Sequence, residues 1–474
     1  MGRILILGCL FFSLIFGCNA RKIKPNETSP NFILILTDDQ GWNGTSVQMM
    51  DAEPQSKSDY HETPNLESLA ERGMRFSSAY ASAPVCSPSR YSIQFGQTPA
   101  RLQMIRVGMN TDHINHQRPI SIPKLLKNIN SNYTAAHFGK WGIDAHPSEL
   151  GYDESDGITG NKEGGFDYKN HQRQWRNNSS EDPKKIFSTT KKATDFLERQ
   201  ANSKRPFFLQ VSHYAVHSDI MMRKATLNKY QNKAKGAYQK HAGFAAMTED
   251  LDTGLGILLK KLKALGLEKN TYIIYTSDNG AVPIMPPRSK YKKGSNFPLS
   301  RGKWDALEGG IRVPFVIAGP KILAGQESKT PITFSDLLPT LIDLAGGELP
   351  LKAQLDGGSF KNSLFKINKS KINRPSKGLI FHVPYENGIA LKRAHSSVIF
   401  PPYKLIKFYD NNELSLYNLD RDIMEQNDIA LSNPTTLKFM ENLLDTYLKT
   451  VKAPKWKPGL TWKSGSVETI NSFH

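Results

Sequence analysis

Cys86, Pro88 and Arg90 form the short segment Cys-Ser-Pro-Ser-Arg, in which a thiol and a guanidinium lie four residues apart. Pro88 is typical of the first turn of a helix, because a proline loses no hydrogen bond there. Cys86 would then lie just ahead of the helix, with Arg90 one turn further on. A helix N-terminus and a guanidinium lower a thiol pKa and favour anions, which predicts a reactive cysteine at an anion site. An ordinary buried cysteine is the alternative.

The N-terminal residues are typical of an export signal. A basic residue precedes a short apolar run, and a glycine comes just before Cys18. We interpret residues 1–17 as a lipoprotein signal peptide, Cys18 as the lipid-bearing residue and residues 18–30 as a tether. A plain secretory signal cleaved after Ala20 is the alternative. The predicted location is the periplasm or the outer membrane of a bacterium, with the lipid as the contact to the membrane.

The use of cysteine also favours chemistry at position 86. Of the three cysteines, Cys9 lies in the predicted signal and Cys18 at its end, so Cys86 is alone in the mature chain. An exported chain that can form no internal disulfide keeps such a cysteine for another purpose.

The charge balance predicts a polyanionic partner. The 474 residues include 62 Lys and Arg against 44 Asp and Glu, a formal net charge of +18. No nucleic-acid-binding motif is recognisable, so an anionic polysaccharide or a membrane surface fits better than nucleic acid. Basic residues that serve only solubility are the alternative.

Apolar runs alternate with amphipathic segments, which predicts an α/β fold. Residues 31–37, 206–212 and 271–277 are continuous apolar runs, as expected for strands buried on both faces of a mostly parallel sheet flanked by helices. A shift to polar composition divides the chain into a catalytic domain, residues 31–377, and a smaller C-terminal α+β subdomain, residues 378–474.

Oxygen-bearing side chains follow two of the predicted strands. Asp38 and Asp39 come directly after the first strand, and Asp278 and Asn279 follow a later one. Open α/β sheets place their ligands at the carboxyl ends of strands, so we expect these four side chains at one edge. Adjacent carboxylates repel each other unless a cation lies between them, which predicts a site for a hard, oxygen-binding metal ion.

Taken in order, these blocks resemble the type I sulfatases of the alkaline phosphatase superfamily. The segment from Cys86 to Arg90 fits the C-x-P-x-R signature of that family, and the resemblance covers residues 31–430. It implies an alkaline-phosphatase-like fold. The other matching blocks are Thr37-Asp38-Asp39-Gln40-Gly41, Gly139-Lys140-Trp141, His217 after a Phe-Phe-Leu strand, Ser277-Asp278-Asn279-Gly280, and Lys303 ahead of Glu308-Gly309-Gly310-Ile311-Arg312.

The resemblance implies that a maturation enzyme oxidises Cys86 to formylglycine. One oxygen of the hydrated aldehyde would attack sulfur, and the other would expel sulfate as the aldehyde re-forms. The resemblance also implies Ca²⁺, which suits oxygen ligands where zinc would favour histidine or thiolate. The implied ligands are Asp38, Asp39, Asp278, Asn279 and the modified Cys86.

The same family pattern implies roles for four further side chains. Arg90 would hold the hydrated aldehyde, and Lys140 and Lys303 would bind sulfate oxygens and offset the charge of the transition state. His217 would act as general acid on the leaving oxygen. Ordinary surface lysines, and a polar contact from the nearby His213 in place of His217, are the alternatives.

One position departs from the family pattern. Many sulfatases have histidine after Gly-Lys-Trp, whereas this chain has Gly142. A second imidazole is therefore absent or comes from His137, His146 or His213. The departure affects the acid–base assignment and leaves the predicted class unchanged.

The sequence predicts an exported, exo-acting sulfatase whose substrate is a sulfated poly- or oligosaccharide. The irregular segment 170–176 could line a glycan pocket, with Trp175 stacking on a sugar, or it could be a packed loop. A phosphodiesterase or phosphonate hydrolase of the same superfamily is one alternative, and a non-catalytic glycan-binding lipoprotein is the other.

Overall fold

The structure is a computed structural model, and the described part of the chain begins at residue 29. The predicted signal peptide (1–17), Cys18 and nearly all of the tether (18–30) lie outside the described residues. No helix in the described part is long and apolar enough to cross a membrane. The described residues are 29–167, 169, 174–283, 295–350, 353–366, 371–386 and 393–459.

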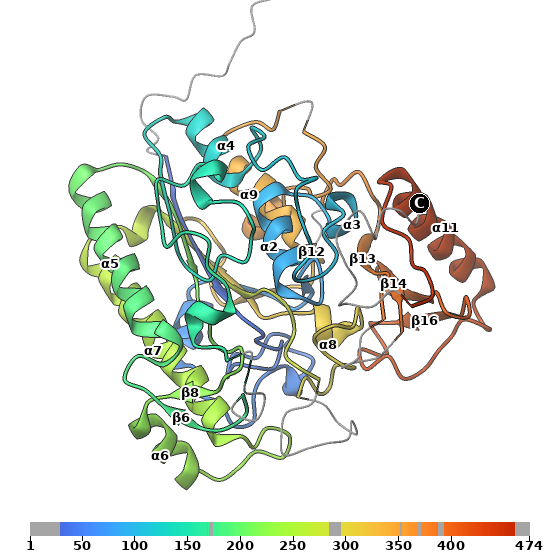
Figure 1. Ribbon diagram of the computed structural model, residues 1–474, viewed down its shortest axis with the longest axis horizontal. Helices are drawn as coiled ribbons and strands as arrows, with labels where there is room; N and C mark the ends of the chain where they lie inside the picture. Colours follow the sequence, from blue (N-terminus) through green and yellow to red (C-terminus); the bar gives the residue numbers. More distant parts are fainter. Residues whose placement is uncertain are drawn as a thin grey trace, which may run out of the picture.

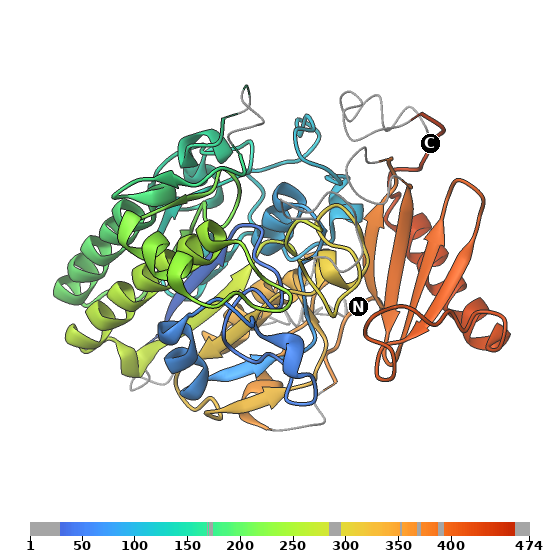
Figure 2. The ribbon, with the colours of Figure 1, turned by 90° about the horizontal axis from the view of Figure 1, so that it is seen from below.

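A mixed sheet of eight strands forms the centre of the molecule (Figures 1 and 2). The central strand, β1, pairs in parallel with both β9 and β7, whereas β10 runs antiparallel to β9. The mostly parallel sheet predicted from the apolar runs is confirmed. In order across the sheet the strands are β11 (Gln326–Ser328), β2 (Met74–Phe76), β10 (Phe315–Ala318), β9 (Thr271–Ser277), β1 (Asn31–Thr37), β7 (Phe207–Ser212), β4 (Thr134–Gly139) and β5 (Glu154–Ser155).

Helices cover both faces of this sheet and create two hydrophobic cores. Phe32 and Leu34 of β1 belong to the core under α2, α4 and α9, while Ile33 and Ile35 belong to the core under α1, α5 and α7. Alternate residues of one strand are thus buried on opposite faces, which explains its continuous apolar sequence. The helices are α2 (Cys86–Phe95), α4 (Ile122–Ile129), α9 (Leu337–Leu344), α1 (Pro64–Glu71), α5 (Ile186–Ser203) and α7 (Ala242–Ala264).

A smaller antiparallel sheet with one long helix forms the C-terminal part, at the right of Figures 1 and 2. Its four strands pair in sequence order, and α11 (Pro434–Thr450) packs against the two middle strands. The predicted α+β character is confirmed, and the exact domain boundary at residue 377 stays a prediction. The strands are β13 (Leu379–Val383), β14 (His395–Phe400), β15 (Tyr403–Phe408) and β16 (Leu414–Asn418).

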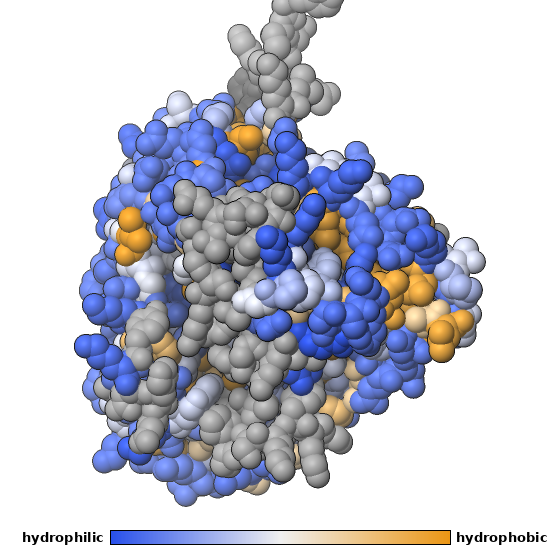
Figure 3. All heavy atoms as spheres, turned by 45° about the vertical axis from the view of Figure 1, so that its right-hand side comes forward, coloured by the Kyte–Doolittle hydropathy of each residue, from blue (hydrophilic) through white to orange (hydrophobic). Residues whose placement is uncertain are grey.

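The remaining elements are short connections, and several border the site described below. The face drawn in Figure 3 is mainly hydrophilic where it is coloured. These elements are η1 (Pro54–Ser56), β3 (Ala79–Tyr80), α3 (Pro99–Leu102), η2 (Pro147–Leu150), η3 (Asn161–Gly164), β6 (Asn178–Ser179), η4 (Pro183–Lys185), β8 (Met221–Met222), α6 (Lys224–Asn232), η5 (Glu268–Asn270), α8 (Glu308–Ile311), β12 (Ile332–Thr333), η6 (Phe334–Asp336) and α10 (Lys361–Phe365).

Candidate active site

The ends of β1 and β9 bring the four predicted oxygen ligands together. The parallel register pairs the last residue of one strand with the last of the other, so the residues that follow are neighbours. The backbone N–H of Asp39 donates to Asp278 Oδ1 at 3.2 Å, and Asn279 Nδ2 donates to Asp39 Oδ1 at 2.7 Å. Asp38 and Asp278 are fully buried. The predicted meeting of these side chains at one sheet edge is present in the structure.

Cys86 lies at the same edge, as the first residue of α2. The prediction had placed it just ahead of the helix, but Val85 is the N-cap. A ligand atom of Asp38, one of Asp278 and the Cys86 Sγ all lie within 4.8 Å of one another. The thiol is 2% exposed, and burial raises its pKa, with Lys140 and Lys303 opposing the effect. The predicted low thiol pKa is therefore wrong, because burial outweighs the nearby positive charge.

Each carboxylate of the site faces one buried cation. Two nitrogens of Arg90, Nε and Nη2, lie 3.0 and 2.8 Å from Asp278 Oδ2. The guanidinium also donates to the Lys140 carbonyl, so Arg90 contacts both Asp278 and the backbone of Lys140. In the other two pairs, Lys140 Nζ lies 2.6 Å from Asp38 Oδ2, and Lys303 Nζ lies 2.7 Å from Asp39 Oδ2.

These pairs set the charge states of the site. Burial alone would raise the pKa of Asp38, but Lys140, His217 and Arg90 together hold it well below its usual range. Burial would likewise lower the pKa of Lys303, whereas Asp39 raises it above its usual range. Asp38, Lys140 and Lys303 are therefore ionised at neutral pH.

Two oxygens of this cluster have no hydrogen-bond partner among the described residues, and this observation tests whether a cation fits. Asp38 Oδ1 and Asn279 Oδ1 are buried and accept no hydrogen bond. Burial, with the charge of Asp38, raises the pKa of Asp278 to about 7, so this carboxylate also lacks full compensation by the protein. Carboxylate and amide oxygens are ligands of hard cations, and a buried oxygen without a partner is costly. The residues present therefore fit a Ca²⁺ ion.

His217 lies at the rim of the cluster on the segment that follows β7. Backbone hydrogen bonds between this segment and Asp38 fasten it, from Asp38 N to the Ala215 carbonyl at 2.9 Å and from Val216 N to the Asp38 carbonyl at 2.7 Å. The imidazole Nδ1 lies 2.5 Å from the Ser218 carbonyl oxygen. Nε2 therefore faces the site, 3.6 Å from Asp39 Oδ2.

The same environment keeps the imidazole neutral in the absence of a ligand. Burial, followed by the charge of Lys303, lowers the pKa of His217 to about 4. A neutral ring with hydrogen on Nδ1 presents a lone pair at Nε2.

The position after Gly-Lys-Trp has no room for a side chain. Gly142 adopts φ +69°, and a Cβ there would lie 2.9 Å from Cδ of Arg90. Of the three other candidates, His137 interacts with Arg90 and with the Lys140 backbone, whereas no described interaction joins His146 or His213 to the site cluster. His137 contacts Ser212 Oγ at 3.1 Å, and burial, followed by Arg90, lowers its pKa to about 3. His146 caps η2, and burial lowers the pKa of His213 to about 4.

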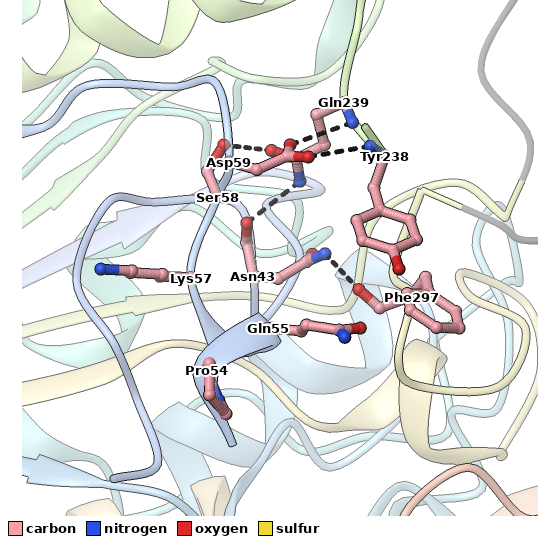
Figure 4. A pocket seen from close by; sticks show the side chains of 9 residues that line it. All are labelled: Asn43, Pro54, Gln55, Lys57, Ser58, Asp59, Tyr238, Gln239 and Phe297. Carbon is pink, nitrogen blue, oxygen red and sulfur yellow. Dashed lines mark hydrogen bonds between the residues drawn. The ribbon is translucent and has the colours of Figure 1, made fainter. Parts of the chain in front are cut away.

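A pocket beside the loop after β1 is lined by other residues (Figure 4). Its cavity volume is about 100 Å³, and the rings of Tyr238 and Phe297 stack at one end with centroids 4.5 Å apart. Asn43 Nδ2 donates to the Phe297 carbonyl at 2.7 Å, as the dashed line shows. No predicted site residue lines it. The lining residues are Asn43, Pro54, Gln55, Lys57, Ser58, Asp59, Tyr238, Gln239 and Phe297.

Sequence reasoning missed two side chains that border the site. Trp304 is partly exposed and adopts φ +77°, and Lys303 Nζ lies 5.3 Å from the centroid of its ring. Its position next to Lys303 in the sequence was the available signal. Asn161 Nδ2 lies 3.5 Å from His217 Nε2, and nothing in the sequence indicated this. Trp175, the predicted sugar-stacking residue, packs against a hydrophobic cluster beside α7, and residues 170–173 lie outside the described residues.

The fold and the site define an α/β protein with a buried charged cluster, which fits a metal ion, at the carboxyl edge of its sheet. Within that class, the chain belongs to the sulfatase family: the family model Sulfatase matches residues 30–347. A second model, N-sulphoglucosamine sulphohydrolase, C-terminal, matches residues 303–453. The family resemblance predicted from the ordered motifs is confirmed.

Two relatives show the extent of the similarity. N-acetylgalactosamine-6-sulfatase of Mus musculus is 31% identical over 365 residues, covering 69% of this chain and 65% of the relative. The chain therefore spans somewhat less than two thirds of that mammalian protein. A sulfatase of Formosa agariphila is 26% identical over 541 residues, covering 95% of this chain and 94% of the relative.

Solved structures show the same fold. The crystal structure of Ps i-CgsB has a TM-score of 0.72 at 24% identity, covering 94% of this chain and 97% of that one. A structure in complex with its substrate D-glucosamine-2-N,6-O-disulfate has a TM-score of 0.70 at 21% identity, covering 90% and 98%. The predicted fold class is confirmed.

Proposed function

We propose that this chain is an exo-acting sulfatase that hydrolyses sulfate esters on a poly- or oligosaccharide. The observation that carries the proposal is the placement of Cys86 among buried oxygen ligands, two of which lack a protein partner. Names of relatives agree with a glycan substrate, since an ulvan-active sulfatase of Formosa agariphila is 26% identical over 365 residues. A structural neighbour is solved in complex with k-i-k-neocarrahexaose.

The metal and the modified cysteine follow from the family and from the fit of the residues. Asp38, Asp39, Asp278 and Asn279 would hold Ca²⁺ together with residue 86, and the ion would supply positive charge that favours an anionic substrate. Formylglycine at position 86, made by a maturation enzyme, would supply an oxygen nucleophile and a route for releasing sulfate. Arg90 would orient this residue.

Lys140 and Lys303 are the sulfate-binding residues of this proposal. Both ammonium groups are buried at the cluster, and both are held by carboxylates in the ligand-free structure. Their N–H groups would donate to sulfate oxygens and offset negative charge as the ester bond breaks. Because the lysines are already fixed by Asp38 and Asp39, they need little rearrangement to do so.

His217 is the proton donor of this proposal. Only its Nε2 faces the cluster, because Nδ1 is bound to the Ser218 carbonyl. A sulfate ester would bring a negative charge beside this nitrogen, and negative charge favours the imidazolium. The proton on Nε2 could then pass to the sugar oxygen as the bond to sulfur breaks.

Export and a lipid anchor at Cys18 complete the proposal. They are supported by the sequence of residues 1–18, which precede the described part of the chain. Labelling with a lipid precursor, with Cys18→Ala as the control, distinguishes a lipoprotein from a chain cleaved after Ala20.

The test is sulfate release from a panel of defined sulfated mono- and disaccharides, with phosphate mono- and diesters assayed beside them. The protein is made together with a maturation enzyme and assayed with Ca²⁺, and Cys86→Ala is the blank. We expect sulfate from at least one sugar and none from the blank. Faster hydrolysis of phosphate esters would support the phosphodiesterase alternative, and sugar binding without release by either protein would support the non-catalytic one.

A further inference from the structure

Lys184 is a buried lysine that the proposed reaction does not use. It lies in η4, just before α5, and its side chain is 2% exposed, whereas that of Lys185 is exposed. Both residues adopt the left-handed backbone conformation, with φ of 51° and 53°. Such a conformation is uncommon for residues other than glycine, and burying an amine is costly unless it has a partner.

The partner of Lys184 is the backbone carbonyl of Ser218. Lys184 Nζ donates to this oxygen at 3.0 Å, and His217 Nδ1 contacts the same oxygen at 2.5 Å. A carbonyl oxygen only accepts hydrogen bonds, so Nδ1 carries a hydrogen. One backbone atom thus joins the buried amine to the imidazole at the rim of the site.

The hydrogen bond to the Ser218 carbonyl is the shortest described polar contact of the imidazole. Nε2 lies 3.6 Å from Asp39 Oδ2 and 3.5 Å from Asn161 Nδ2, and the Phe166 ring packs against the imidazole at 5.1 Å between centroids. These contacts are longer than the bond to Ser218. The direction of Nε2 therefore depends on where the Ser218 carbonyl is held.

We propose that Lys184 is a positioning residue, which holds the Ser218 carbonyl so that His217 directs Nε2 at the leaving oxygen. The inference rests on the proposed function. In the step concerned, a deprotonated oxygen at residue 86 would bond to sulfur as the bond from sulfur to the sugar oxygen breaks. The electron pair stays on the sugar oxygen, which takes the proton from Nε2. The ring is left neutral, with Nδ1–H still on Ser218.

The charge state of Lys184 does not decide this role. Burial lowers the pKa of Lys184 to about 8, against the attraction of Asp38 and Asp219. The ammonium and the neutral amine both carry N–H groups, so either form can donate to the carbonyl.

The test is a double-mutant cycle on the sugar sulfate that the wild type desulfates fastest in the panel. The variants are Lys184→Met, Lys184→Gln, His217→Gln and the combination of Lys184→Met with His217→Gln. Lys185→Met is the matched control, since it makes the same change one residue away at an exposed position. Thermal unfolding shows which variants are folded. If Lys184→Met does not fold, Lys184→Gln replaces it in the cycle.

We expect Lys184→Met to lower kcat by about 10- to 100-fold with little change in KM, as for a misdirected catalytic group. The double variant should match His217→Gln, because a residue that acts through His217 has no effect once the imidazole is gone. Lys185→Met should match the wild type. For 4-nitrophenyl sulfate, whose leaving group needs little protonation, the loss in Lys184→Met should be smaller.

The positioning role would be overturned if the loss of kcat in the double variant were the product of the losses in the two single variants. It would also be overturned if Lys184→Met had the same kcat as Lys185→Met. A wild type that releases sulfate from no ester would instead overturn the proposed function. The two failures are therefore distinct.

Discussion

Two buried clusters of charge in the described part of the chain differ in how many of their oxygens have no hydrogen bond. The site cluster pairs Asp38, Asp39 and Asp278 with three cations, Lys140, Lys303 and Arg90. Within the described part of the chain, Asp38 Oδ1 and Asn279 Oδ1 accept no hydrogen bond. A cluster that is incomplete in this way is one that an ion or a substrate can complete.

The second cluster, called the anchor cluster here, joins α8 to the C-terminal sheet and consists of Tyr80, Glu308, Arg312, Lys404 and Glu425. Lys404 Nζ lies 3.0 Å from Glu308 Oε1 and 2.7 Å from Glu425 Oε1. The other oxygen of Glu308 lies 2.6 Å from Arg312 Nε, and that of Glu425 accepts the Glu308 N–H at 2.8 Å. Each of these carboxylate oxygens therefore lies within 3.0 Å of a protein nitrogen, although Glu425 Oε1 makes only an ion contact with Lys404 and no hydrogen bond.

The comparison teaches that burial and charge do not by themselves mark a reactive site. Lys303 and Lys404 are both buried beside carboxylates, and among the described residues both clusters contain an oxygen without a hydrogen bond, yet only the site cluster also contains Cys86. The anchor cluster holds the C-terminal sheet against the segment that carries Lys303, so its role is to keep the site in place.

The largest expected effect is on stability, from Lys404→Met. It leaves two buried carboxylates facing each other without their shared cation, which costs about 3–5 kcal/mol of unfolding free energy. Urea unfolding measures it. Lys407→Met on the same strand is the control, because that lysine is 15% exposed at its side chain and pairs with Asp445 at the surface. Equal losses of unfolding free energy in the two variants would mean that the buried Lys404 contributes no more to stability than the surface Lys407.

The next effect is on activity, from Lys303→Met. Removing one preorganised donor to the sulfate should lower kcat/KM by about 10²- to 10³-fold. With Ca²⁺ present we expect a smaller loss of stability than in Lys404→Met, because Asp39 keeps its hydrogen bond from Asn279 Nδ2. Sulfate release and urea unfolding are measured on both proteins. A Lys303→Met protein that is destabilised but fully active would contradict the difference between the clusters.

Calcium should stabilise the protein only through the site cluster. At a concentration of about 100 times Kd, a ligand of the native state adds about 2.7 kcal/mol of stability. The rise in melting temperature with Ca²⁺ should be lost in Asn279→Ala, which removes one of the oxygens without a partner, and kept in Lys404→Met. A rise that survives in Asn279→Ala would place the ion elsewhere.

The smallest expected effect is a loss of stability in acid, next to the anchor cluster. His395 Nε2 accepts the Ala306 N–H at 2.8 Å, and burial lowers the pKa of His395 from 6.5 to about 4. The unfolded chain is protonated at this histidine below about pH 6.5 and the native chain only near pH 4. Its contribution is therefore complete above pH 6.5 and is lost as the pH falls toward 4.

The expected size of this loss is about 2 kcal/mol, measured as the difference in unfolding free energy between pH 7 and pH 4.5. The variant His395→Gln should show a shallower pH dependence than the wild type. An identical pH dependence in both proteins would mean that the histidine does not titrate in this way.

Much of the sheet and of the site cluster could be predicted because both depend on local order in the sequence. A continuous apolar run indicates a strand buried on both faces, and the residue after it must lie at the carboxyl edge. The ends of β1 and β9 followed this rule. Lys140 and Lys303 were found through family motifs, since a lysine beside glycine is otherwise indistinguishable from a surface residue.

The rest depends on tertiary contacts that spacing does not encode. The high pKa of Cys86 reflects burial, whereas the sequence indicated only the helix end and Arg90, whose guanidinium is engaged by Asp278. Lys184 and Lys185 are identical neighbours, and only the fold shows which one is buried. Lys404 meets Glu308 across 96 positions of sequence, a pairing that composition and periodicity cannot indicate.

The most direct test of the account combines peptide mass spectrometry across Cys86 with an assay of sulfate release on the same preparation. The protein is made with and without a maturation enzyme. We predict that sulfate release rises in proportion to the fraction of chains that carry the aldehyde at position 86. Sulfate release by a preparation in which residue 86 is entirely the thiol would contradict the account.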